Sequence, residues 1–176
     1  MDFLSLAKMR CSVRSYTDKP VEDEKIAAIL EAGRVAPTGK NNQPHRLLVV
    51  KSKEGLEKLA KSTLTANAYT ATAAIVVCAE HDAAWVRSID GHNIYEIDAT
   101  IVTTHMILEA TEQGLGSLWV CRFDPEILKT EFNIPDAFVP VNILFLGYAE
   151  PSAIKSDERF DEMRKPLCET VWYESF

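Results

Sequence analysis

The centre of the chain contains the unbroken apolar run Ala74-Ile75-Val76-Val77-Cys78-Ala79. A strand with one wet face would alternate apolar and polar residues, whereas this run has no polar position. The run is also too short for an ordinary helix, which favours a strand. The sequence therefore predicts a strand in a sheet whose two faces are both covered by other parts of the protein.

Segments on either side of this run supply the remaining strands and helices. Three further, mostly apolar segments, residues 47–50, 118–121 and 141–146, complete a predicted sheet of at least four strands. Helices are predicted by apolar residues at helical spacing, by acids that open a helix and by prolines that interrupt one. The expected helices are an N-terminal one and residues 21–36, 54–62, 96–113 and 125–132, the last with Asp124 as its N-cap.

The longest predicted helix, residues 96–113, is apolar around much of its circumference. A helix that is apolar on more than one side is buried on more than one side. In a chain of 176 residues, an interface between subunits is a natural way to bury the second side. Gly114 and Gly116 are expected to end the helix. Its apolar residues are Ile97, Ile101, Val102, Met106, Ile107 and Leu108.

Length and composition narrow the class of protein. The chain fits one domain, residues 1–176, with no repeat, linker or low-complexity tract. A net charge of −7 disfavours nucleic acid as a partner, and no apolar run approaches the roughly 20 residues of a membrane span. The start of the chain does not fit a signal peptide, and four widely spaced cysteines suggest neither a disulfide framework nor a zinc site. We therefore expect a cytoplasmic protein that binds no metal, nucleic acid or membrane.

Three polar clusters are candidates for binding chemistry. The first, Arg10-Cys11-Ser12-Val13-Arg14, places two guanidinium groups around a hydroxyl and could clamp a phosphate. The second, residues 38–43, carries amides that could hydrogen-bond the edge of a heterocycle, and Arg164-Lys165-Pro166-Leu167 adds further positive charge. Each has a plainer interpretation, namely solvated or paired charges for the basic clusters and an ordinary turn for residues 38–43. The histidines are scattered at 45, 81, 92 and 105, and none is indicated as a general base.

The last six residues are Val171-Trp172-Tyr173-Glu174-Ser175-Phe176, with three aromatic side chains. A free end of this composition frays unless another surface holds it. Docking onto a partner subunit and packing against the chain's own domain both remain open.

Taken in order, these segments resemble the nitroreductase family of FMN-dependent oxidoreductases over nearly the whole chain. The family's R-x-S-x-R-x-aromatic start is similar to Arg10-Cys11-Ser12-Val13-Arg14-Ser15-Tyr16, followed by Pro20-Val21. Its A-P-S-G-x-N-x-Q-P-W turn is similar to Ala36-Pro37-Thr38-Gly39-Lys40-Asn41-Asn42-Gln43-Pro44. The later landmarks are Ile97-Asp98-Ala99, Gly114-Leu115-Gly116, Leu146-Gly147-Tyr148 and Arg164-Lys165-Pro166-Leu167. Each motif is weak alone, but six in this order and spacing are specific.

The resemblance implies an α+β fold with a mixed central sheet flanked by helices, in an intertwined homodimer with two FMN sites at the interface. It assigns the phosphate and ribityl end of FMN to the two basic clusters, and contacts from the other subunit to the turn. Backbone amides near residue 121 would face flavin N5, Asn67 would contact the polar edge of the ring, helix 96–113 would form the dimer core, and the C-terminal aromatics would wrap the partner. The implied cofactor-binding residues are Arg10, Cys11, Ser12, Arg14, Pro37, Thr38, Asn41, Gln43, Asn67, Cys121, Arg122, Arg164 and Lys165.

The expected activity is transfer of hydride from NADH or NADPH to an electron-poor acceptor, such as a nitroaromatic or a quinone, by a ping-pong mechanism. No side chain is expected to act as acid or base, and Cys121 is expected to be a small core residue rather than a redox group. The sequence departs from the family pattern at His45, where tryptophan is usual, at Thr38, where serine is commoner, and at Cys121-Arg122, where some members have Glu-Gly. The resemblance implies that these positions surround the substrate pocket. Flavin reduction for a partner, a dehalogenase-like task and non-catalytic flavin binding remain alternatives.

Overall fold

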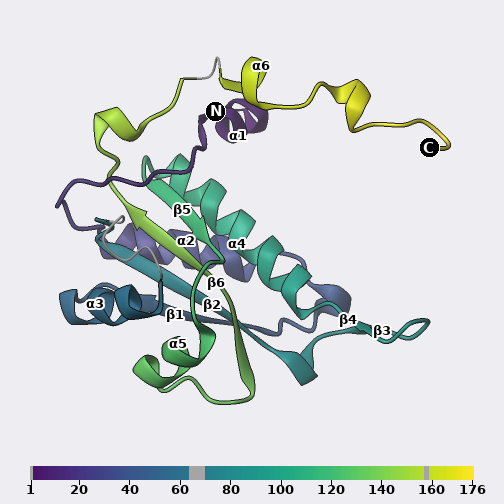
Figure 1. Cartoon of the computed structure of the whole chain (residues 1–176), viewed down its shortest axis with the longest axis horizontal. Helices are drawn as coiled ribbons and strands as arrows, with labels where there is room; N and C mark the ends of the chain where they lie inside the picture. Colours follow the sequence, from purple (N-terminus) through teal and green to yellow (C-terminus); the bar gives the residue numbers. More distant parts are fainter. Residues whose placement is uncertain (1, 64–69, 157–158) are drawn as a thin grey trace.

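A computed structural model describes residues 2–63, 70–156 and 159–176, and its centre is a four-stranded sheet (Figure 1). The strand order is β1 (His45–Val50), β2 (Ala73–Glu80), β6 (Phe138–Gly147) and β5 (Gly116–Val120). Each neighbouring pair of these strands is antiparallel. Outside the named strands, an isolated parallel bridge joins Ser12 to Ser117. The predicted α+β class is confirmed.

The predicted central run lies in β2, and its side chains supply both cores. Ala73, Ile75, Val77 and Ala79 belong to one apolar cluster, whereas Ala74, Val76 and Cys78 belong to the other. Successive side chains of a strand point to opposite faces, so an unbroken apolar run serves two layers at once. The expectation of a sheet covered on both faces is confirmed.

Four helices form those two layers. On one face, α2 (Asp23–Arg34) and α4 (Tyr95–Glu112) pack together and bury Ile29, Val102 and Met106. On the other face, α3 (Lys53–Ser62) and α5 (Pro125–Phe132) pack together and bury Leu59 and Leu128. The short helix α1 (Phe3–Met9) packs against α4, and α6 (Arg159–Met163) lies beside α1 (Figure 1).

The helix ends follow local chemistry. Asp2, Ser52 and Asp124 cap α1, α3 and α5, each accepting a hydrogen bond from a backbone N–H of the first turn, as expected for Asp124. Gly114, at φ +74°, ends α4 in the left-handed conformation. The expectation that Gly116 also ends this helix is wrong, because Gly116 begins β5. A Cβ atom there would lie 2.8 Å from the Val13 side chain, so glycine allows a close approach of two chain segments.

β6 is longer than the sequence predicted because it continues through a proline. Pro140 lies opposite Cys78, where the register between β2 and β6 shifts between Val77 and Cys78. A bulge leaves a position without a ladder hydrogen bond, so the strand can include a proline, which has no backbone N–H to donate.

The outer side of α4 is not covered by the described part of the chain. Its buried side is Asp98, Ala99, Val102, Thr103, Met106 and Ala110, whereas Ile97 is 48% exposed. The predicted dimer would bury this side.

Within the described residues, no helix is both long and apolar enough to cross a membrane.

Two segments extend away from the body in Figure 1. One is a hairpin of β3 (Val86–Arg87) and β4 (His92–Asn93), and the other is the C-terminal tail. In the tail, Trp172 is 52% exposed and Tyr173 is 85% exposed. The interpretation that the tail packs against its own domain is therefore wrong, while docking onto a partner stays a prediction. Short 3-10 turns at Gly39–Asn41, His81–Ala83, Pro151–Ala153 and Leu167–Glu169 complete the described chain.

Candidate functional site

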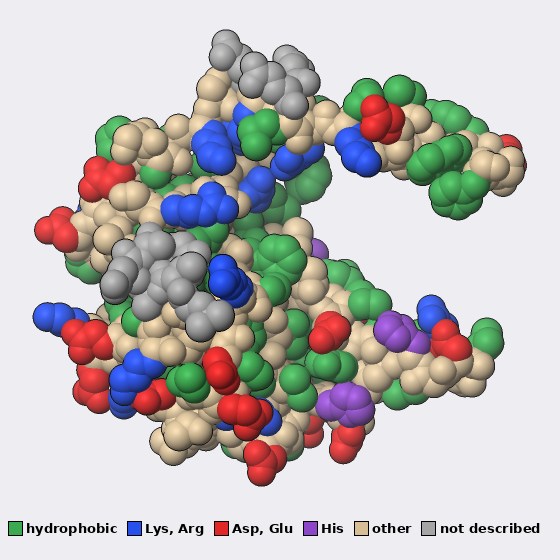
Figure 2. Space-filling view, in the orientation of Figure 1, with side chains coloured by type: hydrophobic (Ala, Val, Ile, Leu, Met, Phe, Trp, Pro, Cys, Tyr) green, Lys and Arg blue, Asp and Glu red, His purple; other side chains and the backbone are tan. Residues whose placement is uncertain are grey.

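Positive charge converges where the chain leaves α1. Arg159 donates from Nη2 to the backbone oxygens of Lys8 and Arg10, the latter at 3.2 Å. Burial, and then repulsion from Arg159 and Arg164, lowers the pKa of Arg10 below its usual range, although the nearby Cys11 opposes this. Figure 2 shows Lys and Arg side chains gathered in this part of the molecule. We call Arg10, Arg159 and Arg164 the arginine cluster. Repelling guanidinium groups held together are well suited to bind an anion.

An apolar groove begins at the arginine cluster. It lies between α1, α4 and β5 and encloses about 490 Å³, within the usual range of small-molecule sites. Val13 donates its backbone N–H to the Ser117 oxygen at 3.0 Å, which fixes the segment carrying Arg10 and Ser12 beside β5. The groove is lined by Phe3, Ala7, Arg10, Ser12, Thr104, Ile107, Leu108, Ser117 and Trp119.

Cys121 and Arg122 follow directly after β5 and are exposed. Since β5 starts beside Ser12, residue 121 lies about 13 Å along the strand from Ser117. Burial raises the pKa of the Cys121 thiol, and the negative charge of Glu96 adds to the rise. The expectation that Cys121 is a core residue is wrong, because β5 has already left the core at this position.

The 38–43 turn has an unusual backbone. Lys40, Asn41 and Gln43 adopt positive φ angles of 49°, 58° and 51°. Such conformations in residues with a side chain cost of order 1 kcal/mol or more each, and they concentrate at functional sites. Gln43 donates its N–H to Thr38 Oγ1 at 3.0 Å, and Gly39 donates its N–H to Asp98 Oδ1 at 2.8 Å.

The turn and the groove lie at different points along α4. The turn is bonded to Asp98, near the start of the helix, whereas the groove reaches Leu108, ten residues further on. Ten residues of helix correspond to about 15 Å. Within one chain, the turn is therefore held apart from the arginine end of the groove.

The other predicted cofactor-binding residues differ in how exposed they are. Cys11 is buried in the second core. Arg14 is exposed, with Nη1 3.4 Å from the Ser12 oxygen. Arg164, Lys165 and Pro37 are exposed, and Asn67 lies outside the described residues.

Two residues at the site were given no role by sequence reasoning, although Asp98 stands in one of the quoted motifs. Asp98 is only 1% exposed, and the signal for it was an acid within the apolar pattern of the long helix. Arg159 holds the backbone of α1 from a distance of about 150 positions in sequence, so no local pattern could have indicated it.

A second cavity of about 460 Å³ lies on the other side of the sheet, under α3, with Leu56, Ala60 and Phe145 in its lining. None of the predicted cofactor-binding residues lines it. We favour the groove along α4 because positive charge converges there.

Within the described ranges, no group of three or more His, Cys, Asp or Glu side chains is arranged to hold a metal ion.

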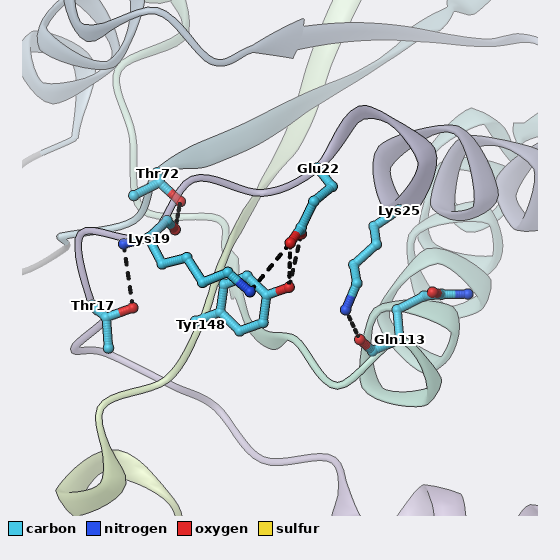
Figure 3. Close-up of polar contacts among 7 residues, drawn as sticks. All are labelled: Thr17, Lys19, Glu22, Lys25, Thr72, Gln113 and Tyr148. Atoms are coloured by element: carbon cyan, nitrogen blue, oxygen red, sulfur yellow. Dashed lines mark hydrogen bonds and ion pairs between the residues drawn. The ribbon is translucent and has the colours of Figure 1, made fainter.

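The Leu146-Gly147-Tyr148 landmark has a structural role (Figure 3). The Tyr148 hydroxyl donates to the Glu22 carboxylate at 2.7 Å, and Lys19 lies 3.8 Å from the centre of the Tyr148 ring. The hydrogen bond from Tyr148, assisted by Lys19, lowers the pKa of Glu22 to about 2. Lys25 donates to the backbone oxygen of Gln113. These contacts tie α2 to the end of β6 and the end of α4.

Fold and site together define an α+β protein with an arginine cluster at one end of an apolar groove. The model of the nitroreductase family matches residues 7–90 and 64–148, and the chain belongs to this family.

Three relatives illustrate the range of similarity. A nitroreductase family protein from Clostridium difficile 630 has a solved structure with a TM-score of 0.94 and 48% identity, covering 100% of both chains. A protein of Archaeoglobus fulgidus, provisionally named an NADH dehydrogenase/NAD(P)H nitroreductase, is 32% identical over 92% of this chain and 94% of its own length. A protein of Desulfovibrio desulfuricans that is provisionally named a nitroreductase has a structure solved in complex with FMN. Its TM-score to this chain is 0.79 and its sequence identity is 27%, covering 98% of this chain and 96% of that chain.

Proposed function

We propose that the protein is an FMN-dependent oxidoreductase that takes hydride from NADH or NADPH and reduces an electron-poor acceptor such as a nitroaromatic or a quinone. The observation that carries this proposal is the arginine cluster at one end of an apolar groove, which suits a ligand with an anionic end and a flat body. The family relative solved with FMN supports the choice of ligand.

The residues present fit FMN. Arg10 and Arg164 supply charged donors for the phosphate, Ser12 supplies a hydroxyl, and Arg159 keeps the Arg10 backbone in place. Ile107, Leu108 and Trp119 offer apolar surface for the ring system. When bound, FMN supplies the two-electron redox chemistry of the reaction.

A homodimer completes the site in this proposal. The 38–43 turn is held about 15 Å along α4 from Leu108, so it would serve the groove of the partner rather than its own. The uncovered side of α4 and the extended C-terminal tail supply apolar surface for such an interface. Sedimentation that gives the mass of a single chain at micromolar concentration would contradict the dimer.

One groove serves the nicotinamide and the acceptor in turn, which gives ping-pong kinetics. Among the described residues that line the groove, Arg10 alone has an ionisable side chain, which fits a reaction without a protein acid or base. Parallel lines in double-reciprocal plots would support this scheme, whereas intersecting lines would contradict it.

All four cysteines are free thiols, which agrees with a reducing cytoplasm.

The test is a visible absorption spectrum of the purified protein, recorded without oxygen before and after NADH or NADPH is added. We expect a flavin spectrum that bleaches with at least one of the two donors. A flavin spectrum that persists would favour the non-catalytic alternative. No flavin after reconstitution with FMN would contradict the proposal, and a panel of nitroaromatic, quinone, halogenated and free-flavin acceptors would separate the remaining tasks.

A further inference from the structure

Asp98 is a buried charge with a specific contact. Its side chain is 1% exposed, and Oδ1 accepts the N–H of Gly39 at 2.8 Å. Burying a carboxylate is costly unless hydrogen bonds and nearby positive charge compensate. Asp98 lies in the first turn of α4, where the helix dipole favours a negative charge. The dipole and the Gly39 N–H both offset the cost.

The contact lies directly before the strained part of the turn. Lys40, Asn41 and Gln43 follow Gly39 with positive φ angles, so this segment would relax if it were free to do so. Gly39 is also closely packed, because a Cβ atom there would lie 2.5 Å from Ile94 Cδ1 and 3.1 Å from Trp85 Cβ. The carboxylate and this close packing together fix the start of the turn.

The other end of the turn lies near the same carboxylate. His45 follows two residues after Gln43, and the negative charge of Asp98 acts on its imidazole. His45 Nδ1 and Asp98 Oδ2 are both buried and have no hydrogen-bond partner within the described residues. The start of the turn is therefore bonded to Asp98, and the strand that follows the turn begins with a histidine on which the charge of the same residue acts.

We propose that Asp98 is a positioning residue for the cofactor: its buried carboxylate holds the 38–43 turn in the strained conformation in which the turn reaches the flavin of the partner subunit. This inference rests on the proposed function, because it assumes that FMN binds and that the turn contacts it. Asp98 itself is not among the residues that line the groove.

The same helix offers a matched control. Thr103 is 1% exposed, and its hydroxyl proton lies between two acceptors, the Ala99 oxygen at 2.8 Å from Oγ1 and Asn142 Oδ1 at 3.1 Å, so it is also a buried polar side chain of α4. Its hydrogen bonds join α4 to β6 and to its own helix, and do not involve the turn. Replacing Thr103 disturbs the buried polar layer without releasing Gly39.

The experiment compares Asp98→Ala, Asp98→Asn and Thr103→Val with the wild-type chain. Amide hydrogen exchange at Gly39 is measured by NMR in the FMN-free protein, and the Kd of FMN by fluorescence. Asp98→Ala should speed exchange at Gly39 and raise the Kd at least about tenfold, as expected for one lost charge-assisted hydrogen bond. Asp98→Asn keeps the acceptor oxygen and should stay within about threefold of wild type in both. Thr103→Val should match wild type.

Each contrary outcome identifies what fails. Faster exchange at Gly39 with an unchanged Kd would overturn the positioning role and leave the proposed function standing. Unchanged amide exchange at Gly39 in the Asp98→Ala variant would show that the Asp98 carboxylate does not hold the turn, and would overturn the proposal. A wild-type protein that binds no FMN would overturn the proposed function and this role with it. If Asp98→Ala does not fold, Asp98→Ser replaces it, because its oxygen stops one bond short of the carboxylate oxygen.

Discussion

In the arginine cluster, one arginine holds the backbone that carries another, because Arg159 donates hydrogen bonds to the carbonyl oxygens of Lys8 and Arg10. At the 38–43 turn, the backbone itself is strained and a buried carboxylate holds it. The first region offers charge from side chains near solvent. The second offers a backbone shape that depends on the interior.

This contrast separates stability from affinity. Side-chain charges near solvent contribute little to folding, so the arginine cluster can lose a charge with the fold intact. A buried contact beside strained backbone contributes to both the fold and the site. We therefore expect changes at the turn to move stability and FMN affinity together, and changes at Arg10 or Arg164 to move affinity alone.

The largest effect is expected for Gly39→Val. The new Cβ would lie 2.5 Å from Ile94 Cδ1 and 3.1 Å from Trp85 Cβ. Overpacking of this kind lowers the free energy of unfolding by about 1–3 kcal/mol, and the displaced turn should also weaken FMN binding. Urea unfolding and a flavin titration measure both. Gly39→Ala should act in the same direction but less, and an unchanged urea midpoint with Val would contradict the tight packing.

For Arg10→Ala, we expect the Kd of FMN to rise roughly 10- to 100-fold, since a hydrogen bond to a charged group is worth about 1.5–3 kcal/mol. Stability should hardly change, because Arg159 bonds the main-chain oxygen of Arg10, which the variant keeps. Arg34→Ala is the matched control, because Arg34 is an exposed arginine paired with Glu31. A marked loss of stability in Arg10→Ala would erase the contrast between the two regions.

A pH-dependent effect is expected at His45. Burial, and then Arg46, lowers the pKa of His45 below its ordinary value of 6.5, while Asp98 opposes them. The unfolded chain then binds the proton more readily, so this contribution to stability is present above pH 6.5 and declines as the pH falls below it. The stability difference between wild type and His45→Phe should change between pH 7.5 and pH 5.5 in urea unfolding. A constant difference would show that His45 does not titrate with folding.

The smallest effect is expected for Tyr148→Phe. Tyr148 is the main cause of the low pKa of Glu22, which should move from about 2 towards its ordinary value of 4.5. A carboxyl group whose pKa is lowered by folding stabilises the folded state at pH values above its pKa in the unfolded chain. The variant should therefore be slightly less stable than wild type near neutral pH, and this difference in stability should fade as the pH falls from 4.5 towards 2. An NMR titration of Glu22 measures the shift, with Glu54 as an unaffected carboxylate. No movement at Glu22 would contradict the contact with Tyr148.

Much of the fold could be predicted because local signals agree with the tertiary structure. The β2 run is apolar at every position since both faces are buried, and Asp124 marks the start of α5 with its own side chain. The first part of β6 was not predicted because Pro140 lies in it, and a proline in a central strand is tolerated only at a bulge such as the one that the register shift marks in β6.

The site was harder to predict because its parts are joined across the chain. The motif at Arg10 and the 38–43 turn are local in sequence, so both were found. Arg159 acts on backbone oxygens in α1, and Asp98 on a backbone N–H in the turn, so neither pairing follows from a sequence pattern. Exposure of Cys121 depends on where β5 leaves the core, which the apolar pattern does not indicate.

Because the turn and the arginine end of the groove lie about 15 Å apart along α4, each complete site in the proposed dimer draws on two chains. Two inactive alleles could then complement each other. A mixed dimer of one Arg10→Ala chain and one Asp98→Ala chain would contain one site with both defects and one site with neither. Co-expression of the two variants would restore part of the activity that each lacks alone, a genetic readout of which chain supplies which half.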